Sequence, residues 1–142
     1  MSYVPTDVVE HYLKEAIEIA KSLVPGYRYD ENWNDAQGSA SVAASSVGTV
    51  FYVEKVPDNM SAVVYGLQIL SDLSNVGDIT IEHNEKPIFK TTGDLLAKEP
   101  EQIVTFMPRI LAPGERFAVK VQNKATTSIT VAFRLLARRI WR

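Results

Sequence analysis

The chain has 142 residues, no cysteine and a formal net charge of −2. This length predicts one domain with room for a short appendage, and the lack of cysteine excludes disulfides, thiolate metal ligands and a cysteine nucleophile. The N-terminus has neither the basic nor the apolar segment of a signal peptide, and no apolar run is long enough to span a membrane. We therefore expect a soluble protein made in a cytoplasm.

The charge is divided unevenly along the chain. Residues 1–100 contain 7 Lys and Arg against 15 Asp and Glu, whereas residues 101–142 contain 8 against 2. Such an asymmetry allows an acidic face of one copy to meet a basic face of another. The alternative is that the basic residues cover the solvent side of edge strands, where they also suppress aggregation.

Residues 1–26 are predicted to form an N-terminal amphipathic α-helix that ends at Pro25-Gly26. Apolar residues recur in this segment at helical spacing. They are Val9, Tyr12, Leu13, Ala16, Ile17, Ala20 and Leu23. One such helix ahead of many strands must pack on a sheet or on a neighbouring subunit.

Residues 27–46 are predicted to be an extended arm or a long loop. The first half is polar but contains Tyr27, Tyr29 and Trp33, and the second half consists of small residues. Neither half is periodic, and loops of this length are uncommon unless they are functional or disordered. Because tryptophan is a poor residue to leave in water, we expect Trp33 to dock on another surface.

Residues 47–142 are predicted to form a β-sandwich domain. Alternating apolar residues and turn clusters indicate seven strands, with an eighth if Arg109–Leu111 pairs, and a break is expected at Pro108. The strands cover residues 47–55, 61–73, 78–83, 87–91, 102–107, 116–122 and 128–138. The predicted fold class is therefore mainly β, an antiparallel β-sandwich of the jelly-roll type with one N-terminal helix and a long arm.

The sequence contains no residue set with the spacing of a catalytic or metal site. Near His83 only Glu85 is available, and no second ligand stands at a metal-binding spacing. The run from Asp30 to Asp35 starts like a calcium loop but has Asp35 where glycine is needed and Ser41 where glutamate belongs. A phosphate-binding loop, a dinucleotide fingerprint and a serine nucleophile elbow are also missing. We expect no enzymatic activity, no cofactor and no metal ion.

The C-terminal residues Arg138, Arg139, Trp141 and Arg142 are of the types enriched at interface hot spots. We predict that they contact a partner, together with Tyr27, Tyr29 and Trp33. Arginine and aromatic residues also bind nucleic acid, but the acidic composition argues against that partner. A purely structural alternative is that Trp141 caps the sandwich core.

The aromatic residues of the arm allow a second hypothesis. Tyr27, Tyr29 and Trp33 could stack on sugar rings while Asp30, Asn32 and Asp35 bond hydroxyl groups, as in carbohydrate-binding β-sandwich modules. Spacing alone does not separate this platform from an arm that packs on a neighbouring subunit.

Two stretches, VFYVEKVPDNMSAVVYGLQI and ILAPGERFAVKVQNKATTSITVAFRLLARRI, carry a family resemblance. The matching features are Val56-Pro57, Pro113-Gly114-Glu115, Asn123 and the strand at 129–136. They resemble small jelly-roll virion proteins of tailed bacteriophages over roughly residues 47–140. At the end, where such strands often run into glycine, this chain has Ala137-Arg138-Arg139.

This resemblance implies a structural virion component, either a capsid decoration protein or a head or tail accessory protein. Such proteins act by protein–protein contacts as symmetric homo-oligomers, for example trimers, and contact other virion proteins such as a major capsid protein. They are assembled into the virion in the host cytoplasm, without a membrane. The helix and the aromatic arm would then grip neighbouring subunits.

Overall fold

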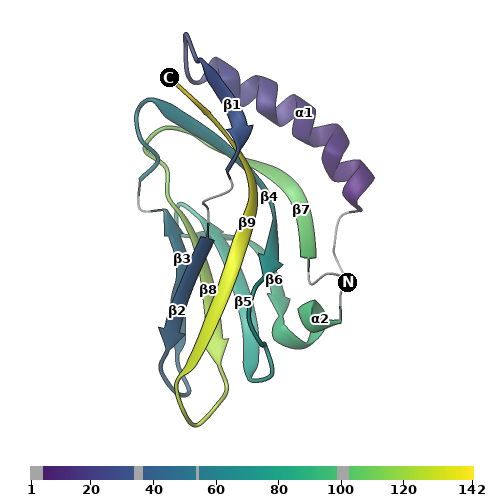
Figure 1. Cartoon of the computed structure of the whole chain (residues 1–142), viewed down its shortest axis with the longest axis vertical. Coiled ribbons are helices and arrows are strands. Elements are labelled where there is room, and N and C mark those ends of the chain that lie inside the picture. The colour runs from purple at the N-terminus through teal and green to yellow at the C-terminus, as the bar shows by residue number, and fades with distance from the viewer. Residues whose placement is uncertain (1–4, 34–36, 54, 99–102) are drawn as a thin grey trace.

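The computed structural model describes residues 5–33, 37–53, 55–98 and 103–142. Within these ranges the chain forms two helices, α1 (Thr6–Ser22) and α2 (Gly93–Ala97), and nine strands (Figure 1). The strands are β1 (Tyr29–Asn32), β2 (Gln37–Val42), β3 (Val47–Val53), β4 (Met60–Ile69), β5 (Val76–His83), β6 (Lys86–Thr92), β7 (Ile103–Leu111), β8 (Phe117–Asn123) and β9 (Ile129–Trp141).

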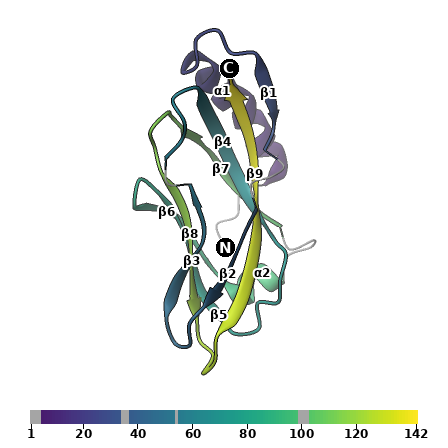
Figure 2. The same cartoon turned by 60° about the vertical axis from the view of Figure 1, so that its left-hand side comes forward.

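The strands form two antiparallel sheets that face each other (Figure 2). One sheet has the order β1-β9-β4-β7, with β2 following β1 along the same edge of β9, and the other has the order β3-β8-β5-β6. The pairs β5–β6, β4–β7, β3–β8 and β2–β9 are all antiparallel, so β2 to β9 form one long ribbon folded at the β5–β6 hairpin.

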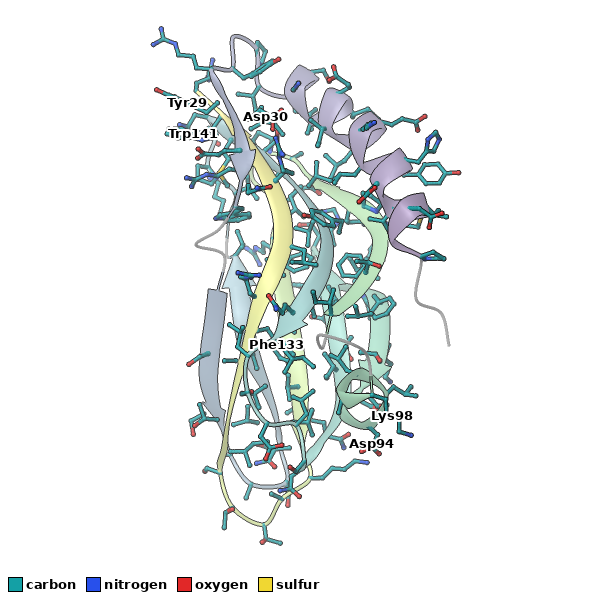
Figure 3. The ribbon with its side chains drawn as sticks, turned by 45° about the vertical axis from the view of Figure 1, so that its right-hand side comes forward. Tyr29, Asp30, Asp94, Lys98, Phe133 and Trp141 are labelled. Atoms are coloured by element: carbon teal, nitrogen blue, oxygen red, sulfur yellow. The ribbon has the colours of Figure 1, made fainter. Side chains whose placement is uncertain are left out.

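Rolling this ribbon brings β4 against β9 and β5 against β8, which is the jelly-roll topology. The predicted fold class is confirmed: the chain is a mainly β antiparallel sandwich with one N-terminal helix. The core lies between the sheets because side chains alternate along each strand. On β8 the inward side chains are Phe117, Val119 and Val121, and on β9 they include Phe133, which is labelled in Figure 3.

Helix α1 lies on the outer face of the β9-β4-β7 sheet (Figure 1). Ala16, Ala20 and Val24 pack against Val63 of β4 and Ile140 of β9. The two small alanines let the helix lie close to the sheet, where the Ser61 hydroxyl donates to the Ala20 carbonyl at 2.8 Å. Among the described residues, neither helix has the length and apolar character needed to cross a membrane.

Strand β7 continues through Pro108, so the predicted break there is wrong. The register against β4 shifts between Val64 and Gly66, and Pro108 lies in this irregular stretch of an edge strand. Proline is tolerated at edges and bulges because it removes no ladder hydrogen bond there. Residues 109–111 pair with β4 as the second half of β7, not as a separate strand.

The segment expected to be an arm or loop instead contributes two strands to the sandwich. Both β1 and β2 pair with β9, β1 at its C-terminal end and β2 at its N-terminal half. Their own sequences carry little strand signal, because β1 is polar and β2 consists largely of small residues. Backbone pairing to β9 determines their conformation, so the sandwich begins near residue 29.

Several turns contain residues with a left-handed backbone conformation, among them the β5–β6 hairpin and the turn at Gly114. Asn84 and Glu85, at the β5–β6 hairpin, have φ angles of 51° and 68°, and Gly114 has φ of 88°. A two-residue hairpin favours positive φ at both positions because its twist then matches that of the strands. Asparagine and glycine adopt this conformation readily, whereas glutamate does so at a cost.

Candidate functional site

The structure brings most of the predicted interface residues together along the β1–β9 ladder. The antiparallel register places Tyr29 opposite Trp141, Glu31 opposite Arg139, and Asn32 opposite Arg138. The two aromatic rings stack with their centroids 4.3 Å apart and their planes at 24°. Figure 3 shows this pair at the end of the sandwich where β1 and β9 meet.

Ion pairs fasten β1 to β9 on both faces of the ladder. On one face, Arg138 Nη2 lies 2.6 Å from Asp30 Oδ1, and Lys21 of α1 approaches the same carboxylate at 3.4 Å. On the other face, Arg139 Nη2 lies 2.6 Å from Glu31 Oε1, which also accepts a 3.1 Å hydrogen bond from the Trp141 indole. We call this set, Tyr29, Asp30, Glu31, Arg138, Arg139 and Trp141, the β1 clamp.

The remaining predicted residues lie near the clamp but have separate contacts. Tyr27 has the Lys21 ammonium 5.5 Å from its ring centroid. Trp33 is half-buried against the main core, as expected, and its backbone N–H donates to the Ala137 carbonyl at 3.0 Å. Arg142 is exposed, and its guanidinium donates to the Pro25 carbonyl at 3.4 Å.

These contacts bear on both hypotheses for the aromatic and basic residues. Within one copy of the chain, Arg138 and Arg139 hold the chain's own β1 strand; contact with a partner remains a prediction. Each aromatic ring of the proposed sugar-binding platform has part of its surface occupied within the chain, which leaves less ring surface for a sugar. Tyr29 stacks on Trp141, Trp33 packs on the core, and Tyr27 lies under the Lys21 ammonium.

The clamp shifts the titration of Asp30. Burial raises the pKa of this carboxyl group, but the hydrogen bond and charge of Arg138, assisted by Lys21, outweigh burial and leave the pKa below its usual value. Burial also raises the pKa of Tyr65, a neighbour of Arg138 and Arg134. Asp30 therefore stays charged in the folded protein over the ordinary pH range.

Helix α1 carries a second apolar face that the sequence reasoning missed. Val8, Tyr12, Ile19 and Leu23 are 37%, 41%, 53% and 37% exposed. At about 100° per residue they lie on one side of the helix, beside the face that packs on the sheet. Tyr12 and Leu23, predicted to share the buried face, are thus exposed. The sequence did contain a signal for this second face, because α1 has more apolar positions than one face of a helix can hold. We call Val8, Tyr12, Ile19 and Leu23 the α1 stripe.

The outer face of the second sheet is hollowed by a polar groove of about 330 Å³. Ala118 on β8 is small, so the groove forms above it between longer side chains. Two ion pairs with N–O distances of 3.0 Å lie along the groove, Lys120 with Glu82 and Arg116 with Glu85. Its lining residues are Thr49, Glu82, Glu85, Arg116, Phe117, Ala118 and Lys120.

His83 ties two turns together. Its Nε2 lies 2.9 Å from Glu115 Oε2, and Arg109 Nε donates to its Nδ1 at 3.1 Å. Burial raises the pKa of Glu115, but the 2.7 Å hydrogen bond from the Ala112 N–H and the His83 ring outweigh it and lower the pKa overall.

The described residues contain no group of three or more His, Asp or Glu side chains arranged to hold a metal ion. Of the run that begins like a calcium loop, Asp30 is paired with Arg138, and Asp35 lies outside the described residues.

The structure thus defines a class: an antiparallel jelly-roll β-sandwich with a helix laid on one sheet. No protein-family model matches the chain, and no curated protein matches it by sequence. Among solved structures, VP2 of infectious bursal disease virus, from its subviral particle, is 10% identical with a TM-score of 0.42. That match covers 84% of this chain and 34% of the VP2 chain, so this chain spans about a third of VP2.

Two further solved structures are similar at a lower level. VP17, a capsid protein of bacteriophage P23-77, is 9% identical with a TM-score of 0.34, and the match covers 84% of this chain and 80% of VP17. PliG, a periplasmic inhibitor of g-type lysozyme from Aeromonas hydrophila, is 9% identical with a TM-score of 0.35, covering 75% of this chain and 83% of PliG.

Proposed function

We propose that this protein is a structural component of a virion, a capsid decoration or head or tail accessory protein that acts by protein–protein contacts in a symmetric assembly. The observation that carries the contact function is the α1 stripe. Large apolar side chains in a row on a folded domain favour burial against another protein, because each leaves unfavourable contact with water. The virion setting is supported by the sequence resemblance over residues 47–140 and by the jelly-roll topology.

A particle-association experiment tests this proposal. A lysate in which particles are being made is separated on a density gradient, and the chain is located with an antibody. We expect the protein in the fractions that contain nuclease-resistant nucleic acid. The variant Ile19→Ser should shift towards the unassembled fractions, whereas Val47→Ser, which removes an exposed apolar residue from β3, should not. Wild-type protein found solely in the light fractions would contradict the proposal.

A carbohydrate-binding function is the second candidate, and the groove on the β3-β8-β5 face is the observation that favours it. Carboxylates, cations and a threonine hydroxyl offer acceptors and donors to a polyol, and Ala118 offers an apolar floor. Glu82→Gln should weaken binding on a glycan array if the groove holds a sugar, while Trp33→Phe should leave it unchanged. Sugar binding that depends on Trp33 would instead indicate a binding site on the aromatic residues of the 27–46 segment.

A further inference from the structure

The α1 stripe has a symmetry of its own. Its four residues are spaced by four, seven and four positions, and this spacing is symmetric about the midpoint between Glu15 and Ala16. Val8 and Leu23 therefore lie at equal distances from that midpoint, on opposite sides of it. Tyr12 and Ile19 are related in the same way. A stripe with this pattern matches itself when one helix is turned end over end, which is the relation that a two-fold axis creates.

The position of the stripe leaves room for a second helix. Lys21, on the opposite side of α1, reaches Asp30 on β1, so the stripe faces away from β1 and past β7, which is the last strand of this sheet in the part of the chain that the structure describes. Figure 1 shows α1 on the β7 side of the sheet. Met107 of β7 is 46% exposed, which adds apolar surface on this strand. A neighbouring helix can therefore lie alongside α1 without displacing a strand.

Hydrogen-bonding groups beside the stripe support the same partner; one of them, Glu18, also pairs with Lys21 of its own chain at 3.2 Å but keeps most of its side chain exposed. His11 and Glu18 lie on the flank of the stripe that points away from the sheet, one before and one after its midpoint. An antiparallel pairing places His11 of each copy near Glu18 of the other, and an imidazole N–H can donate to a carboxylate. The stripe contains one unfavourable residue, Glu15, which the same axis brings close to its own copy.

We infer that the partner of the α1 stripe is a second copy of this chain, docked through an antiparallel, two-fold α1–α1 contact. The contact buries Val8 against Leu23 and Tyr12 against Ile19, twice over. This inference deepens the proposed function by naming the occupant of the same surface. The paired Glu15 carboxylates weaken the contact, so the isolated dimer is expected to be a reversible one.

Cysteine cross-linking tests the pairing directly, because the chain has no cysteine of its own. Val8 and Leu23 are about 22 Å apart along the helix, too far for a disulfide within one chain. The double variant Val8→Cys/Leu23→Cys and the single variant Glu15→Cys should form covalent dimers under mild oxidation. Val8→Cys alone, Leu23→Cys alone and Val47→Cys on β3 should remain monomeric on non-reducing gels.

Light scattering behind a sizing column gives the second readout. Wild type should show a concentration-dependent rise in mass towards twice 15.8 kDa. Glu15→Gln should tighten the dimer by at least about threefold, because it removes a like-charge pair. Ile19→Ser should weaken it by more than about tenfold, because each dimer loses two buried side chains. Since both positions are exposed, thermal melts should confirm that the variants stay folded.

The outcomes separate this inference from the proposed function. Cross-linking of Val8→Cys alone would mean a parallel pairing and would overturn the antiparallel contact. A wild type that stays monomeric with no Glu15→Cys cross-link would overturn the second copy as partner. If Ile19→Ser nevertheless loses particle association, the stripe binds a different protein, and the proposed function stands without this inference. If Ile19→Ser keeps both the dimer and its association with the particle, the α1 stripe is not the contact surface. That result would overturn this inference and the contact role of the stripe, while the proposed function would still be decided by where the wild-type protein is found.

Discussion

At the scale of single residues, buried polar side chains fasten parts of the chain that are distant in sequence. The amide of Asn123 is an example: its nitrogen donates to the carbonyls of Val42, Ala43 and Thr127 at 3.0–3.2 Å, and its oxygen accepts from the Ala125 N–H at 2.8 Å. One side chain at the end of β8 thus holds both the β2–β3 corner and the β8–β9 turn.

Replacing Asn123 with alanine should therefore destabilise the fold by about 2–4 kcal/mol, because several backbone groups lose a partner in a buried place. Urea unfolding measured by circular dichroism gives the free energy of unfolding. Asn59→Ala is the matched control: Asn59 is exposed and its amide donates to the Arg142 carbonyl, so its loss should cost under about 1 kcal/mol. Equal losses in the free energy of unfolding for the two variants would contradict the role given to the Asn123 side chain.

The lowered pKa of Asp30 predicts a pH dependence of stability. A carboxyl group whose pKa falls on folding stabilises the protein above its unfolded-state pKa of about 3.9, and this contribution is lost as the pH falls through the lower folded-state pKa. Asp30→Asn should thus lower the melting temperature at pH 7 and much less at pH 2–3. Glu18→Gln, which alters the exposed partner of Lys21, should change little at either pH.

At the scale of elements, β4 is confined between β9 and β7, and its irregular point is Gly66. A Cβ there would lie 2.6 Å from the Val104 carbonyl oxygen and 2.9 Å from a Leu136 methyl. The carbonyl cannot move away easily because it belongs to the backbone of the paired strand β7, whereas the Leu136 methyl is the end of a flexible side chain. The bulge therefore depends on the absence of a side chain.

Gly66→Ala should cost about 2–3 kcal/mol through overpacking. Gly48→Ala is the matched substitution on β3, where the nearest atoms are the Val42 methyls at 3.1 and 3.2 Å and can shift. Its cost should stay below about 1 kcal/mol. Chemical denaturation of both variants compares the two sites, and a Gly48 variant that is the less stable would show the bulge argument to be mistaken.

The sequence predicted those strands whose pattern is contained within the strand itself, and it missed those whose conformation depends on a distant part of the chain. The alternation along β8 and β9 was predictable because it repeats every two residues within one strand. The strand β1 was not, because its conformation depends on β9, and Asp30 and Arg138 are 108 positions apart. The sequence singled out four clamp residues, Tyr29, Arg138, Arg139 and Trp141, as interface residues, and contact with a partner stays a prediction. No spacing could reveal that these four contact one another and pair with Asp30 and Glu31.

At the scale of the whole molecule, the paired strands of the rolled ribbon are farther apart in sequence the farther they lie from the β5–β6 hairpin. The β5–β6 hairpin joins neighbouring residues, whereas β2 and β9 join residues 37–42 with residues 129–134. Closing distant pairs costs more chain entropy before contacts compensate, so such topologies fold slowly. We expect refolding over milliseconds to seconds, with the β5–β6 hairpin forming before β1 and β2 pair with β9.

Stopped-flow fluorescence tests this order, because Trp33 and Trp141 both lie at the β9 edge. Asp30→Asn should speed unfolding and leave the folding rate nearly unchanged, since late contacts are absent from the transition state. Ile81→Val, in the core next to the hairpin, should slow folding instead. If Asp30→Asn slowed folding and Ile81→Val mainly sped unfolding, the β1–β9 pairing would form before the folding transition state.

Glu85 has a left-handed backbone conformation at the tip of the β5–β6 hairpin and also lines the groove. Glycine would adopt its φ of 68° without strain, so Glu85→Gly should raise the melting temperature, provided that the exposed ion pair with Arg116 contributes little. The same change removes one wall of the groove. The residue that the backbone of this turn favours is therefore not the residue that supplies a carboxylate to the groove, so a gain in rigidity at the hairpin and the loss of an acceptor from the groove come from the same substitution.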